Sequence, residues 1–195
     1  MSNLHFQLTQ ALPVQARQIA TLIMEAMSEE CCRYFAGETH SLTDFHEMMT
    51  RLVGREDSQY SYRNTLVATD EKGNVVGICV SYDGAQLHSL RKTFVTACRE
   101  HFYRDFSDMD DETASGELYI DSLAVCAPLR GKGIAQALLN ATIEKGRELG
   151  LPAVGLLVDT GNPLAERLYR RVGFQYVDNN IWGGHSMRHL QYVLR

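Results

Sequence analysis

Several common sequence features are missing from this chain, and each absence excludes a class of protein. No run of about 18 apolar residues occurs, so neither a transmembrane helix nor a membrane partner is expected. The net charge is −5, from 19 basic and 24 acidic residues, which argues against a general nucleic-acid-binding protein. The first residues, Met1-Ser2-Asn3-Leu4-His5, lack the basic and apolar segments of a secretory signal, so none is expected.

Cysteine and histidine do not form any pattern that binds metal. The five cysteines are odd in number and include no Cys-x-x-Cys pair, so we expect reduced thiols in the cytoplasm rather than disulfides or a zinc site. The seven histidines show no metal-ligand spacing, because His185 and His189 are four apart in an expected strand rather than in a helix. No metal site is therefore assigned.

The composition that remains is typical of one globular domain. Apolar residues make up 45% of the chain and charged residues 22%, which is ordinary for such a protein. A chain of 195 residues can bury a sizeable core, and neither a repeat nor a linker divides it. We therefore expect a single domain over residues 1–195.

The most informative stretch runs from Glu117 to Gly150. Residues 117–125 are rich in β-branched, aromatic and aliphatic side chains, which predicts a strand. Pro128 ends it, because proline cannot donate a hydrogen bond to a sheet. A glycine-rich turn over 130–133 follows, and then a helix is expected. One face of this helix repeats small and apolar residues at helical spacing: Ala135, Leu138, Leu139, Thr142, Gly146 and Leu149.

This strand–turn–helix unit is suited to binding phosphate. The first-turn amides of a helix lack intrahelical partners and carry the positive end of its dipole, and glycines let a diphosphate approach them. Arg130 and Lys132 add full charges. The spacing fits neither the P-loop nor the dinucleotide-binding fingerprint, in which Ala135 would come one residue later. A tight turn without a ligand is the alternative for Gly131 and Gly133.

A second motif lies over residues 162–174. It resembles the Asn-x-x-Ala-x-x-x-Tyr-x-x-x-Gly-Phe segment of the GNAT superfamily of acyl-CoA-dependent N-acyltransferases, with Asn162 first and Phe174 last. The earlier turn resembles motif A of the same family, Arg/Gln-x-x-Gly-x-Gly/Ala, at Arg130, Gly133 and Ala135. The two motifs cover residues 117–178, whereas the first half of the chain resembles the family only in its order of elements.

The resemblance implies both the fold and the co-substrate. The fold class is α/β (α+β), a GNAT fold with a mixed central sheet of about seven strands and helices on both faces. Acetyl-CoA is expected in a cleft where the strands 117–125 and 153–158 splay apart. The residues implied to bind it are Leu123, Ala124, Val125, Arg130, Gly131, Lys132, Gly133, Ile134, Ala135, Asn162 and Tyr169. A helix N-cap explains Asn162 equally well.

Three side chains are candidates for catalysis. By resemblance, the Tyr169 hydroxyl lies near the CoA sulfur and protonates the leaving thiolate; the alternative is a core tyrosine. Strand parity predicts that five side chains share one face: Glu117, Tyr119, Asp121, Leu123 and Val125. Asp121 is our first candidate for the base and Glu117 the second. The alternative for each is a structural salt bridge or hydrogen bond.

Periodicity and turn residues predict the remaining elements. Helices are expected after Pro13 and after Ser41, where Ser41 to Asp44 resembles a capping box. Residues 31–40 show no clear period and indicate a loop or broken helix. The strands are expected over 4–9, 61–69, 75–82, 153–158, 174–177 and 187–194, the last two separated by a Gly183-Gly184 turn.

The segment 84–113 precedes the central strand and is the hardest to interpret. Leu87, Leu90, Phe94, Cys98 and Phe102 predict a helix, whose other face is basic and includes Arg91 and Arg99. An acidic run over 108–112 follows. The segment 84–113 is either a solvated helix with its loop or a wall of the acceptor pocket. Long insertions in compact domains are often functional, which is the reason for the second interpretation.

Together these features predict an N-acetyltransferase. It would move an acetyl group from acetyl-CoA to a primary amine by direct attack in a ternary complex. The alternative is a degenerate domain of the same fold that binds acyl-CoA as a sensor or interaction module. A small molecule and a peptide are both left open as the amine acceptor, and a homodimer is left open too.

Overall fold

The computed structural model describes residues 5–194, so Leu4 of the predicted first strand lies outside the described residues. Seven strands are present: β1 (Gln7–Gln10), β2 (Thr65–Thr69), β3 (Val75–Asp83), β4 (Leu118–Val125), β5 (Ala153–Asp159), β6 (Gln175–Trp182) and β7 (His185–Val193). Six α-helices join them: α1 (Ala16–Met27), α2 (Glu29–Ala36), α3 (Leu42–Val53), α4 (Leu87–Phe102), α5 (Ile134–Glu148) and α6 (Pro163–Val172).

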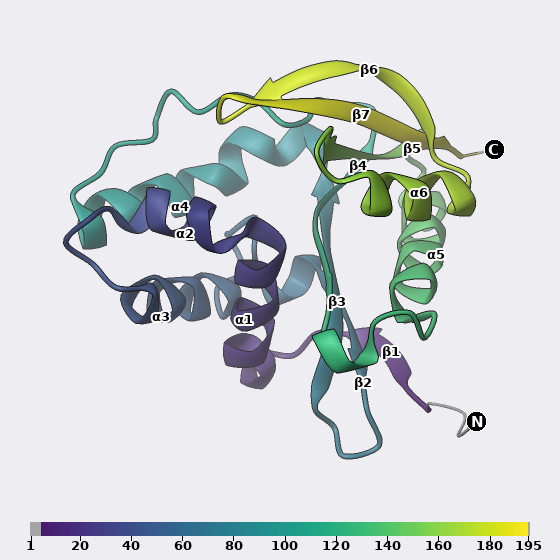
Figure 1. The fold of residues 1–195 in the computed structure, drawn as a ribbon, viewed down its shortest axis with the longest axis horizontal. Coiled ribbons are helices and arrows are strands. Elements are labelled where there is room, and N and C mark those ends of the chain that lie inside the picture. Colours follow the sequence, from purple (N-terminus) through teal and green to yellow (C-terminus); the bar gives the residue numbers. More distant parts are fainter. Residues whose placement is uncertain (1–4, 195) are drawn as a thin grey trace.

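All seven strands form one mixed sheet in the order β1-β2-β3-β4-β5-β7-β6. The pairs from β1 to β4 are antiparallel, β4 and β5 are parallel, and β7 runs antiparallel to both β5 and β6. The predicted mixed sheet with helices on both faces is therefore confirmed. Helices α1 to α4 lie on one side of the sheet and α5 and α6 on the other, while the β6–β7 hairpin arches across the end of the sheet (Figure 1).

Two apolar clusters fill the space between these layers. The first joins α1, α2, α3 and α4 to β2 and β3, and its largest fully buried side chains include Phe45 and Phe94. The second joins α5 to β4 and β5, with Leu138, Leu139 and Phe174 at its centre. The sheet therefore separates an α1–α4 face from an α5–α6 face, and each face has its own core.

Local chemistry explains where the predicted helices begin. Ser41 and Asp44 form the expected capping box, in which the Asp44 side chain accepts from the Ser41 amide at 2.7 Å. Asn162 caps α6 by accepting from the Ala165 amide at 3.2 Å. Gly173 ends α6 at φ +119°, a value that a residue with a side chain rarely adopts.

Three expectations about elements were wrong or incomplete. The segment 31–40 was expected to be a loop or broken helix, but α2 covers its first half and is capped by Ser28. The two final strands are longer than expected, since β6 extends to Trp182 and β7 begins at His185. The full length of these strands was not predicted because their side chains are mostly polar and exposed, and an exposed strand needs no apolar pattern.

Candidate active site

The central strand β4 carries a β-bulge at Asp121. Val80 of β3 pairs with Ser122, and the next residue, Ser81, pairs with Ile120, so Asp121 has no partner in β3. Such a bulge adds one residue to a strand, bends it and redirects the side chains around it. Asp121 is therefore presented by an irregularity of the backbone that strand parity alone does not predict.

Strands β4 and β5 also part beside Asp121. Their parallel pairing covers only three residue pairs and ends at Ile120 and Leu156. Beyond this point β4 continues to Val125 and β5 to Asp159 without pairing to each other. We call this divergence the fork. Along it, the edge of β4 that faces β5 keeps backbone groups that an extended ligand could pair with.

The bulge contradicts one prediction about side-chain direction. Tyr119 packs with Tyr82 and Leu87 on the α1–α4 face, whereas Leu123 and Val125 pack in the cluster on the α5–α6 face. The prediction that all five odd-numbered side chains from Glu117 to Val125 share one face was therefore wrong. The extra residue shifts the alternation by one, so Leu123 and Val125 face the opposite side from Tyr119.

Asp121 is surrounded by neutral hydrogen-bond donors. Its Oδ1 accepts from the Ser122 hydroxyl at 2.8 Å, and its Oδ2 accepts from Gln59 Nε2 at 3.1 Å and from the Tyr82 hydroxyl at 3.5 Å. Burial raises the pKa of Asp121 to about 7, and the nearby Glu112 carboxylate adds to this shift. A carboxylate with this pKa can take up and release a proton near neutral pH.

The insertion before β4 supplies Glu112 to this cluster. The Tyr82 hydroxyl donates to Glu112 Oε1 at 3.1 Å, so one tyrosine contacts both Glu112 and Asp121. Arg91 of α4 is buried and holds the acidic segment: it pairs with Glu112 and Asp111 and donates to two backbone carbonyls in 109–110. The segment therefore packs against the candidate site, which favours the pocket-wall interpretation over the solvated one.

Glu117 takes a different position from Asp121. Its Oε2 accepts from His189 Nε2 at 2.8 Å and from Gln191 Nε2 at 2.7 Å, and its Oε1 accepts from the Thr113 hydroxyl at 2.6 Å. Burial alone would raise the pKa of Glu117, but these hydrogen bonds together lower it. The Glu117 carboxylate accepts three hydrogen bonds and links the start of β4 to β7. This favours a structural role, which was the alternative considered from the sequence.

Tyr169 of α6 lies on the α5–α6 face. Its ring packs edge-on against Phe174, with centroids 6.0 Å apart. No residue in the part of the chain that the structure describes hydrogen-bonds to its hydroxyl. Burial raises the pKa of this phenol, and the nearby Cys79 thiol adds to the shift, so the hydroxyl keeps its proton at neutral pH.

The turn before α5 has the backbone that a phosphate site needs. Gly131 and Gly133 adopt φ of +76° and +86°, and nothing lies within 4 Å of where a Cβ would stand on either. The first bond into the helix runs from the Ala137 amide to the Gly133 carbonyl at 3.0 Å, so the amides of 134–136 have no partner inside the helix. Backbone donors and open space therefore coincide at this turn.

The other residues expected at the cofactor site are partly engaged elsewhere. Arg130 donates from Nε to the Val125 carbonyl at 2.9 Å and from Nη2 to Glu25 at 3.1 Å, yet its guanidinium remains exposed. Lys132 is exposed at the turn. Asn162 uses its side chain as the α6 N-cap, which is the alternative considered for it.

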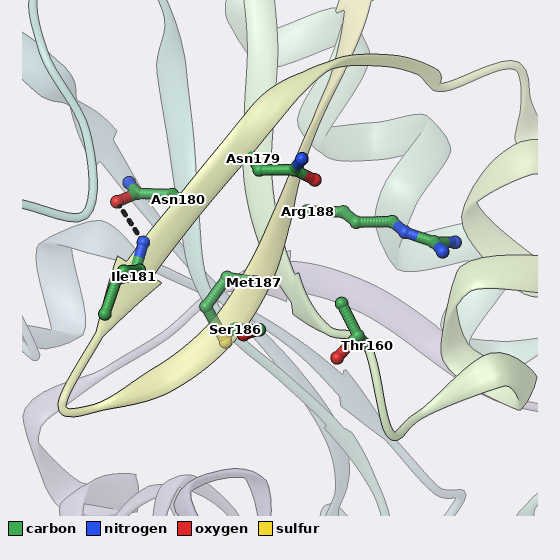
Figure 2. Close-up of a pocket in the computed structure, with 7 residues that line it drawn as sticks. All are labelled: Thr160, Asn179, Asn180, Ile181, Ser186, Met187 and Arg188. Carbon is green, nitrogen blue, oxygen red and sulfur yellow. Dashed lines mark hydrogen bonds between the residues drawn. The ribbon is translucent and has the colours of Figure 1, made fainter.

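Another cavity lies away from the fork, on the β6–β7 hairpin. Its volume is about 670 Å³, and Figure 2 shows the residues that line it: Thr160, Asn179, Asn180, Ile181, Ser186, Met187 and Arg188. Its one charged group is occupied, since Arg188 pairs with Glu166 at 2.6 Å. Its lining includes no carboxylate, imidazole or thiol, so the fork remains the better candidate for chemistry.

Sequence reasoning missed Gln59, Tyr82 and Glu112, because none of them belongs to a motif. Gln59 lies in a loop between α3 and β2 whose residues 58–61 are all buried, an arrangement that a polar Ser-Gln-Tyr-Ser sequence does not suggest. Between residues 5 and 194 no cluster of His, Cys, Asp and Glu could hold a metal ion. Within the same residues no helix is both long enough and apolar enough to span a bilayer.

Comparisons with known proteins agree with this geometry. The family model described as "Acetyltransferase (GNAT) family" matches residues 23–174. A mycothiol acetyltransferase of Propionibacterium freudenreichii is 38% identical over 72 residues, which are 37% of this chain and 22% of that protein. Acetyltransferase Atu2258 of Agrobacterium fabrum is 45% identical over 62 residues, or 32% of this chain and 44% of that protein. The matched segments thus span less than half of either relative.

Solved structures match over nearly the whole chain. A crystal structure described as an acetyltransferase has a TM-score of 0.78 and 26% identity, covering 97% of this chain and 100% of the other. An N-acetyltransferase from Staphylococcus aureus Mu50 has a TM-score of 0.78 at 22% identity, covering 95% and 100%, which supports the fold.

The seven-stranded mixed sheet with helices on both faces matches the α/β fold of these solved acetyltransferases. Since the family model covers more than half of the chain, this protein belongs to the acetyltransferase (GNAT) family.

Proposed function

We propose that this protein is an N-acetyltransferase that transfers acetyl from acetyl-CoA to a primary amine by direct attack in a ternary complex. The observation that carries the proposal is the position of Asp121, a carboxylate with a pKa of about 7 at the point where β4 and β5 part. A base beside a fork that can admit an extended thioester is what amine acylation requires.

The chain offers a fitting place for acetyl-CoA on the α5–α6 face. The amides of 134–136 and the open glycine turn would receive the diphosphate, with Lys132 and Arg130 beside it. The free edge of β4 over 123–125 would pair with the pantetheine arm as an added strand. Bound acetyl-CoA supplies the activated acyl group and a thiolate leaving group.

Each protein group then has one step to perform. Asp121 accepts a proton from the protonated amine, and the neutral nitrogen then forms the new bond to the acetyl carbon and loses its second proton to solvent. As the carbon–sulfur bond breaks, Tyr169 donates its hydroxyl proton to the departing thiolate, which suits a phenol whose raised pKa keeps it protonated. Asp121 afterwards releases its proton to solvent, and Tyr169 takes one back from solvent. Asp121 and Tyr169 belong to opposite faces of the sheet, so the two substrates would meet through the fork.

A single domain accounts for this arrangement, because all strands from β1 to β7 contribute to one sheet. A reducing compartment such as the cytoplasm suits the five cysteines, all of which are unpaired thiols.

The test is CoA release from acetyl-CoA, measured with a thiol reagent in the presence and absence of a panel of primary amines. We expect amine-dependent release from the wild type and almost none from Asp121→Asn. Asp108→Asn is the matched control, since Asp108 is exposed. If acetyl-CoA raises the melting temperature but no amine stimulates release, the protein is an acyl-CoA-binding module instead.

A further inference from the structure

We propose that the acceptor is a positively charged amine with no carboxylate near its reacting nitrogen, in contrast to an amino acid. This inference rests on the proposed function and names its substrate class. It follows from two independent features of the α1–α4 face, namely the pairing of its charges and one buried oxygen atom that lacks a partner.

Two basic side chains on this face, the buried Arg91 and the half-buried His189, each lie between two carboxylates. Arg91 lies between Asp111, at 3.0 Å, and Glu112. All four of its terminal N–H groups are used, because it also donates to the carbonyls of Met109 and Asp110, while the remaining Nε is a buried donor without a partner. This cluster therefore carries excess negative charge, and its cation has no exposed face to offer a ligand.

His189 repeats the pattern on β7. Its Nε2 lies 2.8 Å from Glu117 and its Nδ1 lies 3.3 Å from Asp178. The hydrogen bond to Glu117 is the main cause that raises the pKa of His189, and both ring nitrogens already face a carboxylate. Arg91 and His189 thus each lie between two carboxylates, before Asp121 is counted.

Asp121 itself has no counter-ion. Its hydrogen-bond donors are Gln59, Tyr82 and Ser122, and over residues 5–194 no Lys, Arg or His comes within ion-pair distance of it. Lys145 of α5 is half-buried and donates to the Ser81 carbonyl and hydroxyl, so its charge is engaged on the other face of the sheet. A ligand ammonium would supply the missing charge at Asp121, whereas a ligand carboxylate beside Asp121 would meet a like charge.

The second feature is the Oε1 atom of Gln59. Gln59 is only 3% exposed, and its Oε1 is buried without a hydrogen-bond partner, while its Nε2 donates to Asp121 Oδ2 at 3.1 Å. Because an ionised carboxylate only accepts, Asp121 fixes which end of the amide faces it.

Standard amide geometry places Oε1 no more than about 5.3 Å from Asp121 Oδ2. One nitrogen atom can donate to both oxygens, since two hydrogen bonds of about 2.9 Å span this separation. An unpaired buried acceptor beside an unpaired carboxylate therefore favours a ligand rich in N–H donors, as a primary ammonium group is.

The loop that carries Gln59 is fixed by hydrogen bonds, so the Oε1 acceptor of Gln59 is already in place. Asn64 donates from its side chain to the carbonyls of Ser58 at 3.1 Å and Gln59 at 3.2 Å, and the Tyr60 amide donates to the Ser58 hydroxyl at 3.1 Å. The loop is thus fixed by its own hydrogen bonds, so the amide need not be ordered when the substrate arrives.

The experiment compares amino acids with the amines that remain when their carboxylate is removed. The probes are phenylalanine and phenethylamine, leucine and isoamylamine, and valine and isobutylamine, because the one amine of each amino acid lies next to its carboxylate; they are assayed by CoA release from the wild type. We expect kcat/KM to be about 10–100-fold higher for the amine of each pair that is accepted. Raising the salt concentration should reduce the difference in kcat/KM within a pair, because salt screens exposed charges. It should not abolish the difference, because Glu112 is buried.

A charge variant gives a second measurement. Glu112→Gln keeps the size of the side chain and one acceptor oxygen for the Tyr82 hydroxyl but removes the charge, so the ratio of kcat/KM within a pair should fall at least about threefold. Glu100→Gln, on the exposed side of α4, is the matched control and should leave the preference unchanged. Folding of both variants is verified by their melting temperatures.

The outcomes separate the inference from the proposed function. Equal or faster acetylation of the amino acids would overturn the inference and leave the acetyltransferase function standing. No CoA release with any of the six probes or with the wider amine panel would overturn both. A preference for the amines that Glu112→Gln narrows and Glu100→Gln does not would support the inference.

Discussion

The carboxylate of Glu117 lies directly over Gly155 of the neighbouring strand, so closely that a methyl group on Gly155 would overlap it. The absence of a side chain at Gly155 lets Glu117 pass across β5 and reach His189 and Gln191 on β7. Glu117, which directly precedes β4, therefore crosses β5 and bonds to β7 at the level where β4 and β5 still pair, just before the fork.

Gly155→Ala should therefore destabilise the protein by about 2 kcal/mol or more, because a new methyl group would displace a buried, hydrogen-bonded carboxylate. Urea unfolding measures the free energy. Gly54→Ala is the control, since a Cβ there would meet only ordinary contacts of 3.5 Å and longer. In a Glu117→Ala background the cost of Gly155→Ala should fall sharply; equal costs in both backgrounds would show that the overlap is not the cause.

The Glu117–His189 pair should make stability depend on pH in a definite direction. The hydrogen bond to Glu117 is the main reason that the pKa of His189 is raised. A raised histidine pKa contributes stability that is complete below the unfolded value of about 6.5 and is lost as pH rises through the folded value. The lowered pKa of Glu117 contributes above about 4.3 and is lost in acid.

His189→Gln should thus cost about 1 kcal/mol or more at pH 5.5 and clearly less at pH 9, as measured by urea unfolding at each pH. His185→Gln on the same strand is the control, because the His185 side chain is 62% exposed and its pairing with Asp159 is screened by solvent. A cost for His189→Gln that is equal at the two pH values would show that the histidine acts without its charge.

Asp121→Asn should lower kcat/KM by about two orders of magnitude near neutral pH, since it keeps the shape of the side chain and removes its basicity. In the wild type, kcat/KM should fall as pH drops below about 7, where Asp121 becomes protonated. The variant should lose this dependence and recover part of its activity at high pH, where free amine is abundant. A wild-type acid limb that persists unchanged in the variant would assign it to another group.

Glu112→Gln should move that acid limb to lower pH, because the Glu112 charge helps to raise the pKa of Asp121. The hydrogen bond from Tyr82 can be kept by the new amide oxygen, so kcat at high pH should change little. The measurement is the pH profile of kcat/KM with Glu100→Gln beside it. A limb that moves to higher pH would contradict the proposed electrostatic link.

Tyr169→Phe should lower kcat by about 10²-fold while leaving acetyl-CoA binding almost unchanged, because only the hydroxyl is lost and the ring still packs on Phe174. Binding is measured by the acetyl-CoA shift in melting temperature. Tyr103→Phe, at a side chain that is 86% exposed, is the control. A kcat within about twofold of the wild type under chemistry-limited conditions would leave Tyr169 as a packing residue.

Gly133→Glu should abolish the stabilisation by acetyl-CoA, since it adds bulk and negative charge where the diphosphate is expected. Any side chain at φ +86° is strained, so Gly133→Ala is the matched control for strain alone. An acetyl-CoA shift that survives equally in both variants would place the diphosphate elsewhere.

The parts of this protein that could be predicted from sequence are those governed by local chemistry. The glycine turn, the Ser41 capping box and the Asn162 N-cap depend on residues close together in the chain, and all three lie where the patterns indicate. The bulge at Asp121 could not be predicted, because it arises from the pairing of β4 with β3 across some 40 residues of sequence.

The environment of Asp121 was beyond prediction for the same reason. Gln59 and Tyr82 are 62 and 39 residues away from it in sequence, and no spacing rule connects them. The direction of its pKa shift depends on burial and on Glu112, which come only from the folded arrangement of the insertion. Strand position could therefore identify Asp121 as a candidate base, but it could not show how the surroundings of Asp121 differ from those of Glu117.

The extra residue in β4 also limits how this gene can change in length. A deletion of one residue between 119 and 123 would let β4 pair evenly with β3, a change that most surface strands tolerate. Here Leu123 and Val125 would keep their register with β3 and stay on the α5–α6 face, but the Asp121 carboxylate would be lost or moved out of the fork. A one-residue deletion in this part of β4 should therefore cost the activity while the sheet still forms, so the bulge serves the site and not the stability of the strand.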